Sequence, residues 1–189
     1  MKAPPLLLLR HGETEWNHAG RIQGSLDSPL TPRGLEQAGE QRAILARLPI
    51  AGLPLYVSPL PRARLTAGIA LPGHAQSVDP RLTEIACGAW EGLTPAERAA
   101  GWPELAAECD SDLALYDKAP GGEGLVGVEA RVRDFLSGLD GPAVVVAHKV
   151  VLIVMRGLLR GLDRDALHGL AAPQGVVIRL EDGQETILR

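Results

Sequence analysis

The stretch LLLLRHGETEWN, residues 6–17, joins four consecutive leucines to Arg10 and His11. A compact apolar run of this kind is typical of a strand that is buried on both faces of a sheet. A guanidinium and a titratable imidazole follow where the run ends. The stretch therefore predicts a central strand with a charged site at its carboxyl end.

Similar apolar runs recur along the chain, and helical patterns lie between them. The runs occupy residues 53–57, 143–147 and 175–180, and the helical patterns 32–48, 61–71, 126–139 and 150–162. Thr31 and Pro32 open the first of these helices as an N-cap and a first-turn proline. Alternating strands and helices predict an α/β fold, a three-layer α/β/α sandwich with a mostly parallel sheet.

Two segments depart from this alternation. Residues 176–180 and 184–188 flank Asp182 and Gly183, a hairpin-turn signal that predicts an antiparallel edge strand. Residues 86–124 show no clear strand and several prolines and glycines, so we expect an excursion that covers one end of the sheet. With 189 residues and 46% hydrophobic content, the chain has the size of a single domain, 1–189.

Composition excludes several classes of function. The net charge of −4 leaves no broad basic face for a nucleic acid, so we expect no nucleic-acid partner. The leucine run is too short for a signal peptide or a membrane span, which predicts no membrane partner. Cys87 and Cys109 form no CxxC pair, and reduced thiols suit a cytoplasmic protein.

Three strand ends deliver cations or imidazoles to the same edge of the sheet. Arg10 and His11 follow the first strand, Arg62 opens the helix after the second, and His148 follows the run 143–147. Ligands of open α/β sheets bind outside the carboxyl ends of the strands. The planar guanidinium suits phosphate oxygens, and a neutral imidazole can accept a phosphoryl group. The pattern predicts an anion site that can also react.

Five blocks of the sequence resemble the histidine phosphatase superfamily, the phosphoglycerate mutase-like proteins, and in particular its small phosphatases. They are LLLLRHGETEWN at 6–17, IQGSLDSPLTPRG at 22–34, SPLPRARLTA at 58–67, LTEIACGAWEG at 82–92 and VVVAH at 144–148. The blocks stand in the family's order and span most of the chain. The resemblance implies a phosphoglycerate mutase-like fold.

The resemblance also implies a role for each matched catalytic residue. His11 would be the nucleophile that becomes phosphohistidine, with its second ring nitrogen held by a backbone carbonyl. Arg10, Arg62 and His148 would neutralise the phosphoryl oxygens. Glu84 would protonate the leaving oxygen and then draw a proton from the attacking water.

Further matches concern binding of the substrate. Asn17 and Gln23 match positions that hydrogen-bond the phosphate or the rest of the substrate, and Gly24 matches a glycine where the backbone passes close to the site. Ser58 either adds a hydroxyl near Arg62 or caps its helix, and the cap is the reading we favour. No cofactor is implied, and His18, His74 and His168 show no metal-ligand spacing.

The chain departs from the family in two places. Lys149 follows His148 where the family commonly has glycine; its side chain either enters the phosphate pocket or, as we favour, points away. Residues 86–124 contain two basic and eight acidic residues, which favours a phosphatase over a mutase that must hold two phosphates. As a hypothesis, the substrate beyond the ester is neutral or cationic and meets Trp90 or Trp102.

These inferences predict a metal-independent phosphomonoesterase that acts on a small phosphorylated metabolite through phosphohistidine. Two alternatives remain open. One is a phosphoglycerate mutase, in which the phosphoryl group returns to the substrate instead of passing to water. The other is a regulatory protein that binds phosphoesters without turnover.

Overall fold

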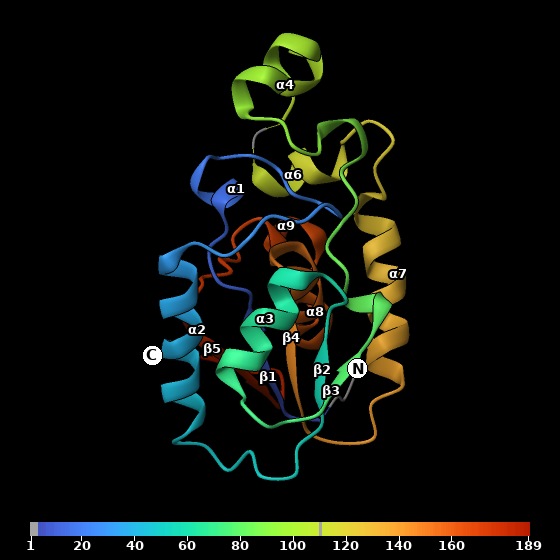
Figure 1. Ribbon diagram of the computed structural model, residues 1–189. Coiled ribbons are helices and arrows are strands. Elements are labelled where there is room, and N and C mark those ends of the chain that lie inside the picture. The colour runs from blue at the N-terminus through green and yellow to red at the C-terminus, as the bar shows by residue number, and fades with distance from the viewer. Residues whose placement is uncertain (1–3, 110) are drawn as a thin grey trace.

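A six-stranded sheet lies at the centre of the computed structural model, which describes residues 4–109 and 111–189 (Figure 1). Its strand order is β3-β2-β4-β1-β5-β6. The first four strands in this order pair in parallel, β5 pairs antiparallel with β1, and β6 pairs antiparallel with β5. The predicted parallel sheet with an antiparallel edge is confirmed. The strands are β1 Leu6–Arg10, β2 Leu55–Val57, β3 Gln76–Val78, β4 Ala143–Ala147, β5 Val177–Glu181 and β6 Gln184–Leu188.

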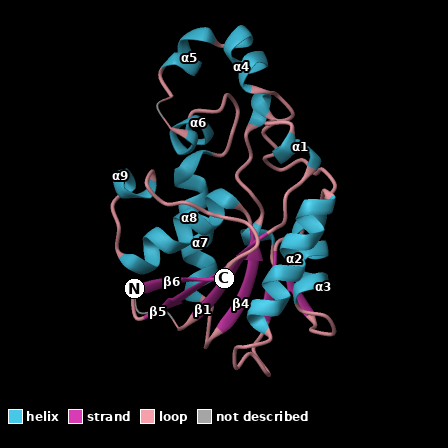
Figure 2. Ribbon diagram, turned by 90° about the vertical axis from the view of Figure 1, so that its left-hand side faces the viewer, coloured by secondary structure: helices cyan, strands magenta, loops and turns pink. Residues whose placement is uncertain are grey.

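Helices cover both faces of this sheet, as predicted for a three-layer sandwich (Figure 2). The helices α2 and α3 pack on one face, and α7 and α8 on the other. Thr31 caps α2 through its side chain and Pro32 stands in its first turn, as the sequence predicts. The helices are α1 Glu15–His18, α2 Pro32–Leu45, α3 Pro61–Ala70, α4 Pro95–Gly101, α5 Pro103–Ala107, α6 Asp112–Asp117, α7 Gly124–Ser137, α8 Lys149–Arg160 and α9 Arg164–Leu167.

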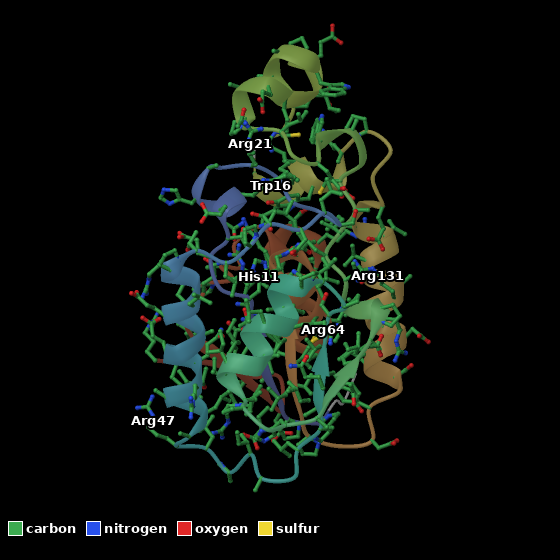
Figure 3. The ribbon with its side chains drawn as sticks, in the orientation of Figure 1. His11, Trp16, Arg21, Arg47, Arg64 and Arg131 are labelled. Carbon is green, nitrogen blue, oxygen red and sulfur yellow. The ribbon has the colours of Figure 1, made fainter. Side chains whose placement is uncertain are left out.

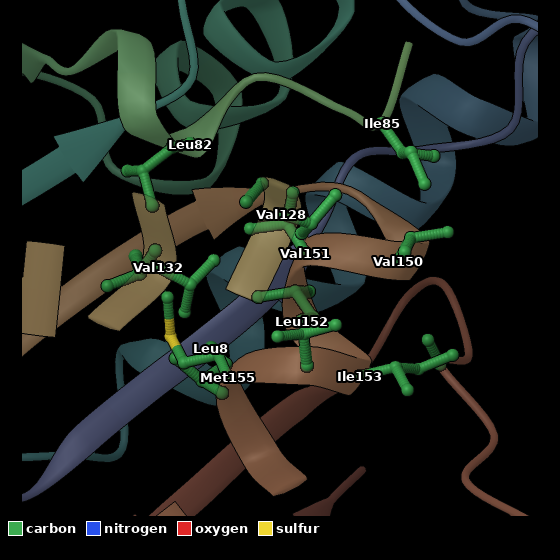
Figure 4. Close-up of a cluster of buried hydrophobic side chains, with 14 of the residues drawn as sticks. Leu8, Leu82, Ile85, Val128, Val132, Val150, Val151, Leu152, Ile153 and Met155 are labelled. Carbon is green, nitrogen blue, oxygen red and sulfur yellow. The ribbon is translucent and has the colours of Figure 1, made fainter. Parts of the chain in front are cut away.

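The leucine run divides its side chains between the two faces, because successive side chains of a strand point in opposite directions. Leu6 and Leu8 join the cluster beneath α7 and α8, whereas Leu7 and Leu9 join the cluster beneath α2 and α3. Figure 4 shows Leu8 close to Met155 of α8 in the first of these clusters. Burial on both faces is why this strand is apolar at every position up to Arg10.

The excursion at residues 86–124 lies beyond the carboxyl ends of the strands, where it contributes α4, α5 and α6 (Figure 2). Side chains cap two of these helices: Thr94 caps α4, and Ser111 caps α6. None of the helices in the described part of the chain is long and apolar enough to cross a membrane.

Candidate active site

Parallel pairing of β1 with β4 brings the two predicted site histidines together. Arg10 lies opposite Ala147 in the register, so His11 and His148 leave the sheet side by side. Their ring centroids are 5.1 Å apart, and both residues are buried. Figure 3 shows His11 between the sheet and the segments above it that include Trp16 and Arg21.

The ring of His11 is held in one tautomer. Its Nδ1 lies 2.7 Å from the carbonyl oxygen of Gly12. A carbonyl only accepts hydrogen bonds, so Nδ1 carries the hydrogen and Nε2 keeps its lone pair. Burial first, and then the charges of Arg10 and Arg62, lower the pKa of His11 well below its ordinary value. The ring is therefore neutral and nucleophilic near pH 7.

His148 is held by a serine that the sequence did not assign to it. Ser58 Oγ lies 2.6 Å from His148 Nε2 and also accepts from the backbone N–H of Leu60 at 3.3 Å. If the hydroxyl donates to Nε2, all three groups are satisfied and the ring hydrogen of His148 sits on Nδ1. His148 Nδ1 is buried and has no partner among the described residues.

The expected cap at Ser58 is wrong. The N-cap of α3 is Leu60, which forms no side-chain cap hydrogen bond. Pro61 already removes one of the N–H groups that a cap would satisfy, and the Ser58 hydroxyl instead contacts His148. Burial, followed by the proximity of His11 and the charges of Arg62 and Arg10, lowers the pKa of His148 well below its ordinary value.

Arg62 is almost fully buried and is held by the loop that follows Gln23. Its Nη1 donates to the Leu26 carbonyl at 2.6 Å and to Asp27 Oδ1 at 3.0 Å, and its Nη2 donates to the Gly24 carbonyl at 2.9 Å. Its Nε is buried without a partner among the described residues. The guanidinium is thus fixed in place, and its Nε–H and second Nη2–H have no partner among the described residues and can bind a ligand.

The loop around Gly24 is tied to the rest of the site by Glu91. The Glu91 carboxylate accepts from the backbone N–H of Ser25 at 2.7 Å and from that of Cys87 at 3.0 Å. Gly24 has φ 54° and a Cβ there would lie 2.1 Å from Glu91 Oε1, so only glycine fits. Gly24, predicted as a binding residue, therefore lies in the site as a support for Arg62.

The Glu84 side chain contacts the N-terminus of α8, the helix that begins directly after His148. Its Oε2 accepts from the N–H of Val150 at 3.2 Å, and its Oε1 accepts from its neighbour Ile85 at 3.0 Å. The N–H groups of a first helical turn have no partner within the helix and favour a carboxylate. These bonds hold the predicted proton donor at the first turn of the helix that follows His148.

The predicted polar residues border the same region. Arg10 donates from Nη1 to the Ala172 carbonyl at 2.8 Å. Asn17 forms a capping box with Thr14 at the start of α1. Its Oδ1 also accepts from Gln174 Nε2 at 3.3 Å, and the same Nε2 donates to the His11 carbonyl at 3.1 Å. Gln174 is a supporting residue that no pattern in the sequence indicated.

Gln23 and Trp90 were both predicted to contact the substrate. Gln23 is buried, and its Oε1 has no partner among the described residues, so a ligand or water can satisfy it. Trp90 is fully buried in the core and packs against Trp102 at a centroid distance of 6.3 Å. The hypothesis that Trp90 forms a substrate wall is wrong, because its apolar ring is used in the core.

Lys149 points away from the two histidines, toward α6. Its Nζ lies 5.7 Å from the ring centroid of Tyr116, and both residues line a pocket of about 490 Å³ that also borders Arg10.

Among the residues that the structure describes, no three His, Cys, Asp or Glu side chains are placed to hold a metal ion.

A neutral histidine with a free Nε2, set among arginines at the carboxyl ends of parallel strands, defines a site for phosphoryl transfer. Residues 6–188 match the model of the histidine phosphatase superfamily (branch 1), and the chain belongs to this family.

Several of the similar proteins are named as phosphatases of small molecules. The chain is 36% identical to glucosyl-3-phosphoglycerate phosphatase of Mycolicibacterium vanbaalenii over 87% of this chain and 78% of the relative. It is 33% identical to phosphoserine phosphatase 1 of Hydrogenobacter thermophilus over 97% of this chain and 90% of the relative. The structure of the α-ribazole phosphatase from Shigella flexneri matches with a TM-score of 0.81 at 29% identity, covering 98% and 94% of the two chains.

Proposed function

We propose that this protein hydrolyses small phosphate monoesters through a phosphohistidine on His11. The observation that carries the proposal is the hydrogen bond from His11 Nδ1 to the Gly12 carbonyl, inside a cluster of buried cationic and imidazole groups. This bond leaves Nε2 as the nucleophile without the need for a base to deprotonate it. The phosphatase relatives support the same reaction.

Two steps complete the reaction. In the first, the lone pair of His11 Nε2 forms a bond to phosphorus, the ester P–O bond breaks, and the Glu84 carboxyl gives its proton to the leaving oxygen. In the second, Glu84 takes a proton from water, the water oxygen bonds to phosphorus, and the P–N bond breaks. Inorganic phosphate leaves, and both residues return to their starting states.

The remaining side chains stabilise charge on the three phosphoryl oxygens. Arg10 and Arg62 supply guanidinium N–H groups, and His148 donates from Nδ1, which carries the ring hydrogen when the Ser58 hydroxyl donates to Nε2. Asn17 and Gln23 add neutral donors at the rim. No step calls for a metal, and hydrolysis in excess chelator tests that directly.

The test compares the wild type with His11→Gln and with His18→Gln on a panel of monoesters. His18 is an exposed histidine in the last turn of α1 and serves as the matched control. We expect phosphate release and an acid-labile phosphoprotein in the wild type and in His18→Gln, and neither in His11→Gln. Hydrolysis that persists in His11→Gln would refute the nucleophile, and return of the phosphoryl group to a second substrate alcohol would identify a mutase.

A further inference from the structure

The carbonyl that fixes the nucleophile belongs to a peptide unit whose N–H is also bound by a side chain. His11 Nδ1 donates to the Gly12 carbonyl at 2.7 Å. The N–H of the same peptide unit, that of Glu13, donates to Gln37 Oε1 at 2.7 Å. We propose that Gln37 is a positioning residue for the nucleophile, because its amide oxygen orients the Gly12 carbonyl and makes it a stronger acceptor. This inference deepens the proposed phosphatase function and rests on it.

Gly12 is a glycine because the chain passes too close to α2 for any side chain. A Cβ at Gly12 would lie 2.2 Å from the Gly34 carbonyl oxygen, and a Cβ at Gly34 would lie 2.0 Å from the Glu13 carbonyl oxygen. Glycine has the widest backbone freedom of all residues, so nothing intrinsic to Gly12 fixes the direction of its carbonyl. That direction must come from bonds to neighbouring elements.

Three side chains hold the two peptide units around Gly12. In the unit before it, the Gly12 N–H donates to Thr66 Oγ1 of α3 at 3.1 Å. The His11 carbonyl, in the same unit, accepts from Gln174 Nε2 at 3.1 Å. The unit after it, which carries the carbonyl that His11 contacts, is bound by Gln37 of α2. Gln37 therefore acts on the imidazole through a single peptide group, more directly than Thr66 or Gln174.

The two successive hydrogen bonds also affect the basicity of the ring. Burial and the two nearby arginines lower the pKa of His11, whereas its bond to the Gly12 carbonyl raises it. Hydrogen bonds in series polarise one another, so an acceptor on the Glu13 N–H makes the Gly12 oxygen more negative. A stronger bond from one ring nitrogen raises the basicity of the other. Gln37 therefore increases the electron density at His11 Nε2.

Greater basicity at Nε2 acts in opposite directions on the two halves of the reaction. It speeds attack on the ester, because the lone pair on this nitrogen is the nucleophile. It slows release of phosphate from phosphohistidine, because the same nitrogen is then the leaving group. Loss of the Gln37 acceptor should therefore slow phosphorylation of His11 and speed its dephosphorylation, whereas general damage to the structure would slow both.

The experiment compares the wild type with Gln37→Met, which keeps the length of the side chain and removes the acceptor. The ester is p-nitrophenyl phosphate, whose leaving group needs no proton from Glu84. At saturating ester, kcat and the fraction of phosphohistidine trapped by rapid quenching together give the rate constants of both halves. We expect Gln37→Met to slow phosphorylation about two- to tenfold, the range for one neutral hydrogen bond, and to lower the trapped fraction. The Nδ1–H proton resonance of His11 should move upfield, because its hydrogen bond is weaker.

Two further variants separate the amide oxygen from the rest of the side chain and from stability. Gln37→Glu still offers an oxygen to the Glu13 N–H, so it should keep the wild-type phosphorylation rate and resonance or exceed them. Gln76→Met is the matched control, since Gln76 also bonds a backbone group, the Arg64 carbonyl at 3.3 Å, but lies on the edge strand β3. It should change neither rate constant and leave the resonance in place.

Three results would overturn the assignment. They are an unchanged Nδ1–H resonance in Gln37→Met, equal slowing of both halves in that variant, and the same losses in Gln37→Glu as in Gln37→Met. Absence of any phosphate release by the wild type would instead refute the phosphatase function, and the resonances would still test whether Gln37 acts on His11.

Discussion

The contact between Ser58 and His148 makes the sharpest prediction about the chemistry of this site. Ser58→Ala removes the hydroxyl that lies 2.6 Å from His148 Nε2. Both residues are 0% exposed, so no solvent replaces the lost partner. A buried imidazole nitrogen left unsatisfied costs about 1–3 kcal/mol. If the transition state loses the same free energy, kcat falls roughly fivefold to 160-fold.

The assay must distinguish a change in the tautomer of His148 from a general loss of stability. ¹⁵N NMR of the histidine rings reports which nitrogen carries the hydrogen, and we expect His148 to change from the Nδ1–H form to a mixture in Ser58→Ala. Ser28→Ala is the control, because Ser28 is also buried but accepts from the N–H of Trp16. It should lose stability without altering His148. Wild-type kcat together with an unchanged His148 spectrum in Ser58→Ala would refute the reasoning.

Two further predictions follow from the proton donor and from burial of the histidines. Glu84→Gln keeps a side-chain oxygen for the Val150 N–H but has no proton to give. The kcat/KM for alkyl phosphates should therefore fall about 10²–10⁴-fold, and that for p-nitrophenyl phosphate should fall much less. Equal losses on both esters would contradict the role of Glu84 as proton donor. His11 and His148 have lowered pKa values in the folded state, so below about pH 6.5 the unfolded chain binds protons that the folded chain does not. The free energy of unfolding, measured with denaturant between about pH 5 and 7, should therefore decrease as the pH falls, by up to about 1.4 kcal/mol per unit for each histidine, and His148→Gln should flatten this slope.

The main strands could be predicted, and so could the position of the site residues at one edge of the sheet, because both depend on local sequence. Apolar runs defined β1, β2 and β4, and the rule for strand ends then placed Arg10, His11, Arg62 and His148 at one edge. The structure brings the two histidines to a centroid distance of 5.1 Å, as that rule requires. Pairing between neighbouring parallel strands can be predicted from the sequence because each of these strands has the same apolar pattern.

Features that depend on partners far along the chain were missed. Ser58 and His148 are 90 residues apart, and nothing near Ser58 distinguishes a hydroxyl that contacts an imidazole from one that caps a helix. The strand β3 consists of Gln76, Ser77 and Val78 at the edge of the sheet, and its exposure removes the apolar pattern that marks a buried strand. Trp90 was misplaced for a related reason, since an aromatic ring in a loop suits a core as well as a substrate wall.

The two histidines gain different roles from two different hydrogen-bond partners. Burial keeps both rings neutral, so their electrostatic environments alone do not distinguish them. The Gly12 carbonyl can only accept, which places the hydrogen of His11 on Nδ1 and frees Nε2 for attack. The Ser58 hydroxyl can donate as well as accept, and when it donates to His148 Nε2 the ring hydrogen of His148 lies on Nδ1. One ring then offers a lone pair and the other an N–H, which is the division that attack on a phosphoryl group requires.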